Sequence, residues 1–223
     1  MSIKLFFESI IKFLLGVFLV GMLLFIPANT INYWNGWLFM GLLFIPMFCA
    51  GIVMMVKEPN LLKSRLNAKE KESEQKEVVA LSGLMFIVGF IVAGLNYRFH
   101  WIELSNIVVI ISSVIFLLSY ILYAEVLREN IFLSRTIEVQ ENQKLITTGL
   151  YGIVRHPMYT ATIFLFLSMP LILGSVISFI VFLIYPFIIV KRIKNEEEVM
   201  ERELKGYKEY KEKVKYRMIP FVW

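Results

Sequence analysis

Long apolar blocks alternate with shorter polar segments along the chain. A helix needs about 20 mostly apolar residues to cross a bilayer, and four blocks reach this length. They are residues 5–27, 36–56, 78–97 and 104–127. The first exceeds the roughly 7–15 apolar residues of a secretory signal peptide, so we interpret it as a membrane span.

A fifth apolar block, residues 157–190, is too long for one span and is interrupted near Pro170 and Gly174. We interpret it as a helical hairpin that is followed by a charged helix. The pattern therefore predicts an all-α, polytopic membrane protein with four spans, a hairpin and a cytoplasmic C-terminal helix. It divides the chain into a four-span region, residues 1–127, and a second region, residues 128–223.

Composition supports this interpretation and excludes a soluble globular domain. Of the 223 residues, 58% are hydrophobic and only 18% are charged, and the mean hydropathy is +0.69. Soluble domains carry about 25% charged residues, interspersed along the chain, whereas the charges here are gathered between the apolar blocks.

The distribution of basic residues predicts the orientation in the membrane. Of the 23 Lys and Arg residues, all but Arg98 fall on one side of the predicted spans. Because basic loops stay in the cytoplasm, we expect both termini to be cytoplasmic, with a bacterial cell membrane as the location. The net charge of +5 then describes a surface that faces anionic lipid headgroups, and no aromatic–basic pattern indicates a nucleic-acid partner.

Metal chemistry is not supported by the sequence. Cys49 is the only cysteine and lies within the second apolar block, while the two histidines, His100 and His156, fall on opposite sides of the predicted membrane. One isolated thiol and two separated imidazoles cannot form a metal site.

Two polar segments flank the third and fourth predicted spans, one before residue 78 and one after residue 127. Residues 57–77 are interpreted as a charged, solvated connector. Residues 128–156 form a longer polar stretch with one possible extended piece at 136–140. Loops of this length are uncommon in compact proteins unless they bind something.

The start of the hairpin gathers polar groups at the edge of an apolar stretch. Pro157 suits the first turn of a helix, and His156 is biased away from helical dihedrals because it precedes a proline. The free N–H groups of that turn, together with Arg155, can bind an anion, and Gly149 and Gly152 allow close backbone approach. Snorkelling anchors and a binding site both remain open here.

The charged helix after the hairpin carries two acids beside an apolar stripe. At 100° per residue, Ile193, Met200 and Leu204 share one face, and Glu196 and Glu197 border it. Carboxylates next to packed apolar residues need partners. A solvated face and a binding role are the two interpretations for this pair.

Three pieces of sequence then carry a family resemblance: "TTGLYGIVRHPMY", "RIKNEE" and "GYKEYKEKVKYRMIP". With these, residues 147–223 resemble the integral-membrane methyltransferases typified by isoprenylcysteine carboxyl methyltransferase, with phospholipid N-methyltransferase-like relatives. Ala161 departs from the resemblance, because the family usually has glycine there.

The resemblance implies S-adenosylmethionine, bound between the hairpin and the C-terminal helix, and a lipophilic methyl acceptor that enters from the bilayer. It implies that Arg155 and Arg192 hold the acceptor. The cofactor contacts that it implies are Leu150, Tyr151, His156, Pro157, Tyr159, Glu196, Glu197, Tyr207 and Tyr210, with the two glutamates as a polar clamp.

Two other functions remain open at this point. One is an NADPH-dependent membrane reductase of sterol-reductase type, and the other is a non-catalytic lipid-binding membrane protein. The acceptor could be a carboxylate, an amine or a thiol, and neither a general base nor the oligomeric state follows from the sequence.

Overall fold

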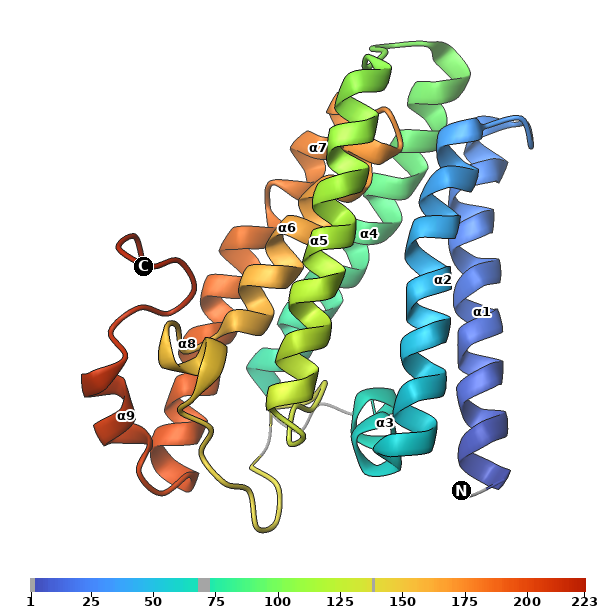
Figure 1. Ribbon diagram of the computed structural model, residues 1–223. Helices are drawn as coiled ribbons and strands as arrows, with labels where there is room; N and C mark the ends of the chain where they lie inside the picture. The colour runs from blue at the N-terminus through green and yellow to red at the C-terminus, as the bar shows by residue number, and fades with distance from the viewer. Residues whose placement is uncertain (1–2, 68–72, 138) are drawn as a thin grey trace.

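The computed structural model describes residues 3–67, 73–137 and 139–223 and is helical (Figure 1). Four long helices come first: α1 (Ile3–Ala28), α2 (Trp34–Lys57), α4 (Ser73–Phe99) and α5 (Asn106–Glu129). The hairpin consists of α6 (Pro157–Ile172), α7 (Val176–Phe182) and α8 (Tyr185–Glu203). Shorter elements are α3 (Pro59–Leu66), the 3₁₀ turn η1 (Gly149–Gly152) and α9 (Tyr207–Lys213). The predicted all-α, polytopic architecture is confirmed.

Five segments are long and apolar enough to cross a membrane, so this is an integral membrane protein. They are α1, α2, residues 75–99 of α4, α5, and residues 176–203, which comprise α7 and α8. By contrast, α6 has only 16 residues, or about 24 Å at 1.5 Å per residue, against a hydrocarbon core of about 30 Å. The hairpin therefore pairs a short arm with a full-length one.

The break in the hairpin lies at Gly174, whose φ of +76° is the left-handed conformation that glycine adopts without strain. Pro170 lies inside α6 rather than at the turn. The hydroxyl of Tyr33, just before α2, donates a 2.6 Å hydrogen bond to the Leu173 carbonyl. The side chain of Asn35, in the first turn of α2, donates a 2.9 Å hydrogen bond to the Ile172 carbonyl. These bonds fix the tip of the hairpin against the end of α2.

Two details of the predicted loops differ from the structure. The connector 57–77 contains α3 and the first turn of α4, because Pro59 starts a helix and α4 begins at Ser73. In the possible extended piece 136–140, residue 138 lies outside the described residues, and its described neighbours belong to no strand.

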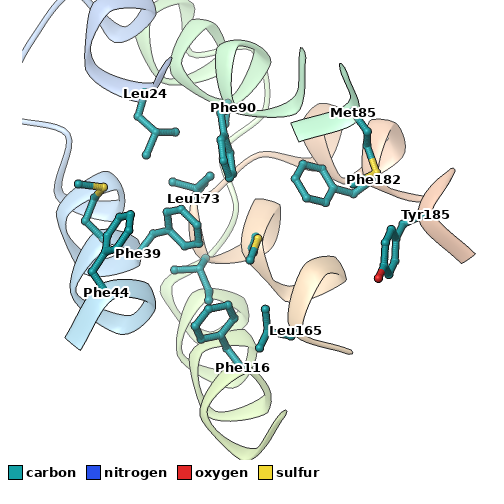
Figure 2. Packing of buried hydrophobic residues seen from close by; sticks show 14 of the residues in the cluster. Leu24, Phe39, Phe44, Met85, Phe90, Phe116, Leu165, Leu173, Phe182 and Tyr185 are labelled. Carbon is teal, nitrogen blue, oxygen red and sulfur yellow. The ribbon is translucent and has the colours of Figure 1, made fainter. Parts of the chain in front are cut away.

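A core of aromatic and aliphatic side chains joins the helices within the membrane layer (Figure 2). Phe39, Phe116 and Phe182 are fully buried in it. At Gly94 of α4 an added Cβ would lie 2.6 Å from the Leu24 carbonyl oxygen of α1, so these two helices touch through a small residue, as membrane helices commonly do. This packing brings α5 against α6 and α4 against α8, which positions the site at one end of the bundle.

Candidate active site

A pocket lies at the end of the bundle where α6 begins and α8 ends. Its lining comes from the loop 130–146, from η1 and the start of α6, from α8, and from α9. Eight of the predicted site residues line it: Tyr151, Arg155, His156, Tyr159, Arg192, Glu196, Tyr207 and Tyr210. The structure thus brings together residues that are up to 59 positions apart in the chain.

The first turn of α6 forms as the sequence predicts. Pro157 is the first helical residue and His156 precedes it with φ −128° and ψ 61°. Upstream, Gly149 has φ +57°, and an added Cβ would lie on the Glu129 carboxylate. That carboxylate accepts a 2.9 Å hydrogen bond from the backbone N–H of Leu150. Leu150 and Pro157 therefore shape the backbone beside the pocket.

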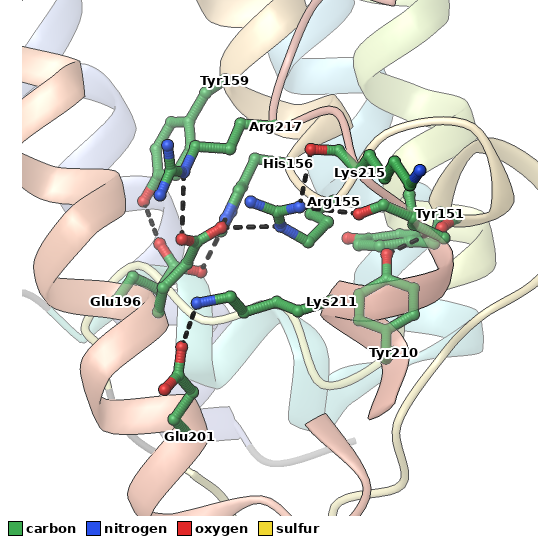
Figure 3. Close-up of polar contacts among 12 residues, drawn as sticks. Tyr151, Arg155, His156, Tyr159, Glu196, Glu201, Tyr210, Lys211, Lys215 and Arg217 are labelled. Carbon is green, nitrogen blue, oxygen red and sulfur yellow. Dashed lines mark hydrogen bonds and ion pairs between the residues drawn. The ribbon is translucent and has the colours of Figure 1, made fainter. Parts of the chain in front are cut away.

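Glu197 lies at the centre of a charge cluster, whose members Arg155, His156 and Arg217 are labelled in Figure 3. Its Oε1 accepts a 2.7 Å bond from Arg155 Nε and lies 3.2 Å from His156 Nε2. Its Oε2 accepts a 3.0 Å bond from Arg217 Nε. With 3% of its surface exposed, Glu197 is neutralised by side chains of the protein itself.

Residues 214–217, after α9, hold the backbone of this cluster in place. Arg155 Nη1 donates bonds of 2.6 Å and 2.9 Å to the first two carbonyls, those of residues 214 and 215. The backbone N–H groups of Arg155 and His156 donate bonds of 3.0 Å and 2.8 Å to the carbonyls of residues 216 and 217. The guanidinium of Arg155 is therefore already engaged by Glu197 and by two carbonyls.

Glu196 has different surroundings and faces the pocket. Its Oε2 accepts a 2.5 Å bond from the Tyr159 hydroxyl, which in turn accepts a 2.9 Å bond from Arg192 Nε. Its Oε1 lies 4.0 Å from His156 Nδ1. The two ring nitrogens of His156 thus face two different carboxylates, one buried and one at the pocket surface.

Arg192 connects this wall of the pocket to two other parts of the chain. Its Nη1 donates a 3.2 Å bond to Gln75 Oε1 of α4, and its Nη2 donates a 2.7 Å bond to the carbonyl of Arg135 in the polar loop. The loop that covers the pocket is therefore tied to the same arginine that orients Tyr159.

The opposite end of the pocket is aromatic. The Tyr210 hydroxyl donates a 2.7 Å bond to the Tyr151 carbonyl. The Tyr207 hydroxyl is buried and has no hydrogen-bond partner among the described residues. Burial, reinforced by the carboxylates of Glu197 and Glu196, raises the pKa of Tyr207 above its usual range, so its hydroxyl remains a donor at neutral pH.

Two residues of the site escaped prediction. Arg217 lies within the quoted piece "KYRMIP", but nothing local indicated that its side chain meets a glutamate 20 residues upstream. Gln75 fell in the segment interpreted as a solvated connector, yet it is fully buried. Its position three residues before Val78, the first residue of the predicted span 78–97, was the signal that could have revealed it, because residues one helical turn apart share a face.

A family model matches part of the chain. Residues 104–206 match the model of the phospholipid methyltransferase family. The match covers a little under half of the chain and shows that this part is similar to that family of integral membrane methyltransferases. The predicted resemblance is confirmed, and the match supports a membrane methyltransferase.

One curated relative points in a second direction. The chain is 29% identical over 91 residues to Delta(14)-sterol reductase TM7SF2 of Mus musculus. The match covers 40% of this chain and 22% of that protein, so the chain spans about a fifth of the length of this relative.

Proposed function

We propose that the pocket binds S-adenosylmethionine and transfers its methyl group to a lipophilic acceptor that arrives from the bilayer. The family match over residues 104–206 supports methyl transfer in the membrane. The observation that carries the cofactor assignment is the buried Tyr207 hydroxyl, which lines the pocket and has no partner among the described residues. A buried polar group without a partner costs about 1–3 kcal/mol, and a polar ligand would remove that cost.

The residues around the pocket fit the chemical groups of this cofactor. Glu196 can accept hydrogen bonds from an ammonium or from ribose hydroxyls, and Tyr207 can donate to a carboxylate or a ring nitrogen. Tyr151 and Tyr210 supply aromatic faces, which attract a cationic sulfonium. Ligand sites commonly combine an apolar lining with a few convergent polar groups in this way.

The contacts of Glu196 and Glu197, the predicted polar clamp, indicate that the two glutamates have different roles. Glu196 is the acid that we assign to the cofactor, because it lies at the pocket surface. Glu197 is assigned to position Arg155 and His156, because its two oxygens are taken by protein donors. Arg155, with its bonds to Glu197 and to two carbonyls, then acts as a positioning residue rather than the residue that binds the acceptor.

The remaining predicted residues keep the roles expected from the resemblance. Arg192 and Tyr159 hold the orientation of Glu196 through consecutive hydrogen bonds. The Arg192 guanidinium also donates to Gln75 and to the Arg135 carbonyl, but unlike Arg155 it is only partly buried, and we therefore assign Arg192 to the acceptor. His156 and Tyr210 line the cofactor site.

Bound S-adenosylmethionine would supply an electrophilic methyl group for in-line displacement. The protein's own residues orient the two reactants and exclude water, which accounts for most of the acceleration in such reactions. A carboxylate acceptor needs no base, whereas an amine or thiol must lose a proton. His156 Nδ1, beside Glu196 at the pocket wall, is the group placed to take it.

Access follows from the fold. The start of α1, α3 and α9 lie at the same end of the bundle as the pocket (Figure 1), and this end carries the basic loops. We assign it to the cytoplasm, from which the cofactor reaches the pocket. A lipophilic acceptor reaches the same depth laterally, because the short helix α6 places the pocket close to the membrane boundary.

The sterol reductase relative favours a second candidate, a membrane reductase that binds NADPH at the same place. A non-catalytic lipid-binding protein is the third. These functions differ in the small molecule that they bind.

Equilibrium binding of labelled S-adenosylmethionine and of NADPH to the purified protein separates the three. Saturable binding of S-adenosylmethionine, lost in Glu196→Gln and kept in the exposed control Glu198→Gln, is the expected result. A methyl-transfer screen with extracted lipids and mass spectrometry then identifies the acceptor. Binding of NADPH alone would replace the proposal with the reductase, and binding of neither would leave the non-catalytic function.

A further inference from the structure

Three exposed apolar side chains follow one another near the end of the chain. Ile219, Phe221 and Val222 have 40%, 88% and 74% of their surfaces exposed, and only Pro220 separates them. We call residues 219–222 the apolar turn. An exposed group of this kind outside the spans marks a contact surface.

Several backbone N–H groups in and around this turn donate to carbonyls within the same short segment. The N–H groups of Arg217, Met218 and Ile219 all donate to the carbonyl oxygen of Trp223, at 2.9, 3.0 and 3.2 Å. The N–H groups of Val222 and Trp223 donate to the carbonyl oxygen of Ile219, both at 3.1 Å. Pro220 has no N–H to satisfy. These bonds pair five backbone N–H groups of residues 217–223 and so lower the cost of moving this part of the chain out of water.

The turn is attached to a membrane helix. Thr160, in the first turn of α6, donates a 2.8 Å bond to the Met218 carbonyl, and Met218 and Trp223 pack against the core that lies within the membrane layer. Figure 1 shows the chain after α9 returning beside α6 and α8 to a level between the two ends of α1 and α2. The exposed side of the turn is thus continuous with the lipid-facing surface of the bundle.

Charges lie where headgroups would meet this surface. Lys215, four residues before the turn, is exposed, and Arg217 stacks over the Trp223 ring at 5.0 Å while it pairs with Glu197. Basic and aromatic residues are the usual neighbours of a segment that enters a membrane from its cytoplasmic face.

We infer that the apolar turn, residues 219–222, inserts into the acyl region of the bilayer beside α6. The occupant of this surface is lipid. The segment just before the turn, residues 214–217, supplies the carbonyls that hold Arg155 and His156, so the seating of the turn in the bilayer also fixes one wall of the pocket.

The single cysteine of the chain makes this inference testable. In a Cys49→Ser background, Phe221→Cys introduces one thiol for an environment-sensitive fluorophore. Two matched variants calibrate it: Phe18→Cys on the exposed face of α1 for lipid, and Lys208→Cys on α9 for water. All three positions are exposed, so the substitutions leave the packing intact.

The labelled proteins are placed in nanodiscs of phosphatidylcholine and phosphatidylglycerol and are titrated with aqueous iodide or with nitroxide-bearing lipid. We expect the label at position 221 to behave like that at position 18, with loss of iodide quenching and strong quenching by the lipid nitroxide. Iodide quenching equal to that at position 208 would overturn the inference. Protection from both quenchers would overturn it too, because a second protein chain would then cover the turn. Neither measurement depends on methyl transfer, so the result is independent of the proposed function.

Discussion

Two regions of the molecule stabilise the fold by different means. The first consists of α1 and α2, and the second is the site region, formed by α6, α8 and residues 204–223. Along α1 most large apolar side chains are exposed to the surroundings, and its inner face packs through Leu24 and small contacts such as that with Gly94. In the site region, charged side chains are buried and bound to one another. In the first region a bilayer replaces the protein interior, so the identity of an apolar residue matters little. In the second, each buried charge depends on a particular partner.

Removal of the central carboxylate should produce the largest effect. Glu197→Gln leaves Arg155 and Arg217 without a compensating charge, and loss of one partner from a buried ion pair costs about 3–5 kcal/mol. We expect a large fall in the thermal unfolding temperature in detergent, together with reduced yield. Glu198→Gln, on the exposed face of the same helix, should change it little. Equal stability of both variants would show that the cluster is not a structural element.

We expect substitution of the neighbouring acid, Glu196, to change stability less than substitution of Glu197 and to weaken cofactor binding specifically. Glu196→Gln keeps the hydrogen bond that Tyr159 donates and removes only the negative charge at the pocket surface. We expect the affinity for S-adenosylmethionine to fall by more than about tenfold, or roughly 1.4 kcal/mol, in isothermal titration calorimetry. If binding fell equally in Glu198→Gln, the assignment of Glu196 would be wrong.

Removal of the Tyr207 hydroxyl should have opposite effects on stability and on cofactor binding. Tyr207→Phe should leave the ligand-free protein equally or slightly more stable, because it removes a buried donor without a partner. It should weaken cofactor binding by about 1 kcal/mol, the worth of one hydrogen bond. Since burial raises the pKa of Tyr207 above its usual range, this difference in affinity should not change between about pH 7 and 9.

Tyr210→Phe is the matched control, because the Tyr210 hydroxyl already donates to the Tyr151 carbonyl. It should destabilise the ligand-free protein by about 1 kcal/mol. Destabilisation by Tyr207→Phe of the same size would mean that its hydroxyl is bound within the protein.

The smallest effect is expected on the lipid-facing side of α1. Phe18 is 64% exposed, and lipid tails are as apolar as the side chain that they contact. Phe18→Ala should therefore change the free energy of unfolding by no more than about 0.5 kcal/mol, measured by thermal unfolding in nanodiscs. A loss of several kcal/mol would indicate that another protein chain packs there.

The sequence was most informative where the environment of a residue depends on its near neighbours. The spans, the hairpin and the start of α6 at Pro157 all follow from the hydrophobic pattern and from proline geometry, and the structure confirms them. The placement of Glu196 and Glu197 beside an apolar stripe also followed from a period of 100° per residue. Periodicity put the two acids at similar distances from the stripe and could not separate their roles.

What the sequence determined by itself is thus the membrane architecture and the group of residues that meet at one end of it, because apolar length and helical period are local properties. Only the tertiary structure decided which acid is buried and which faces the pocket. It also decided that Gln75 and Arg217 reach this site from distant segments. The physical reason is that a buried charge takes its partner by proximity in space, within a few ångströms, and the chain brings those partners together only when it folds.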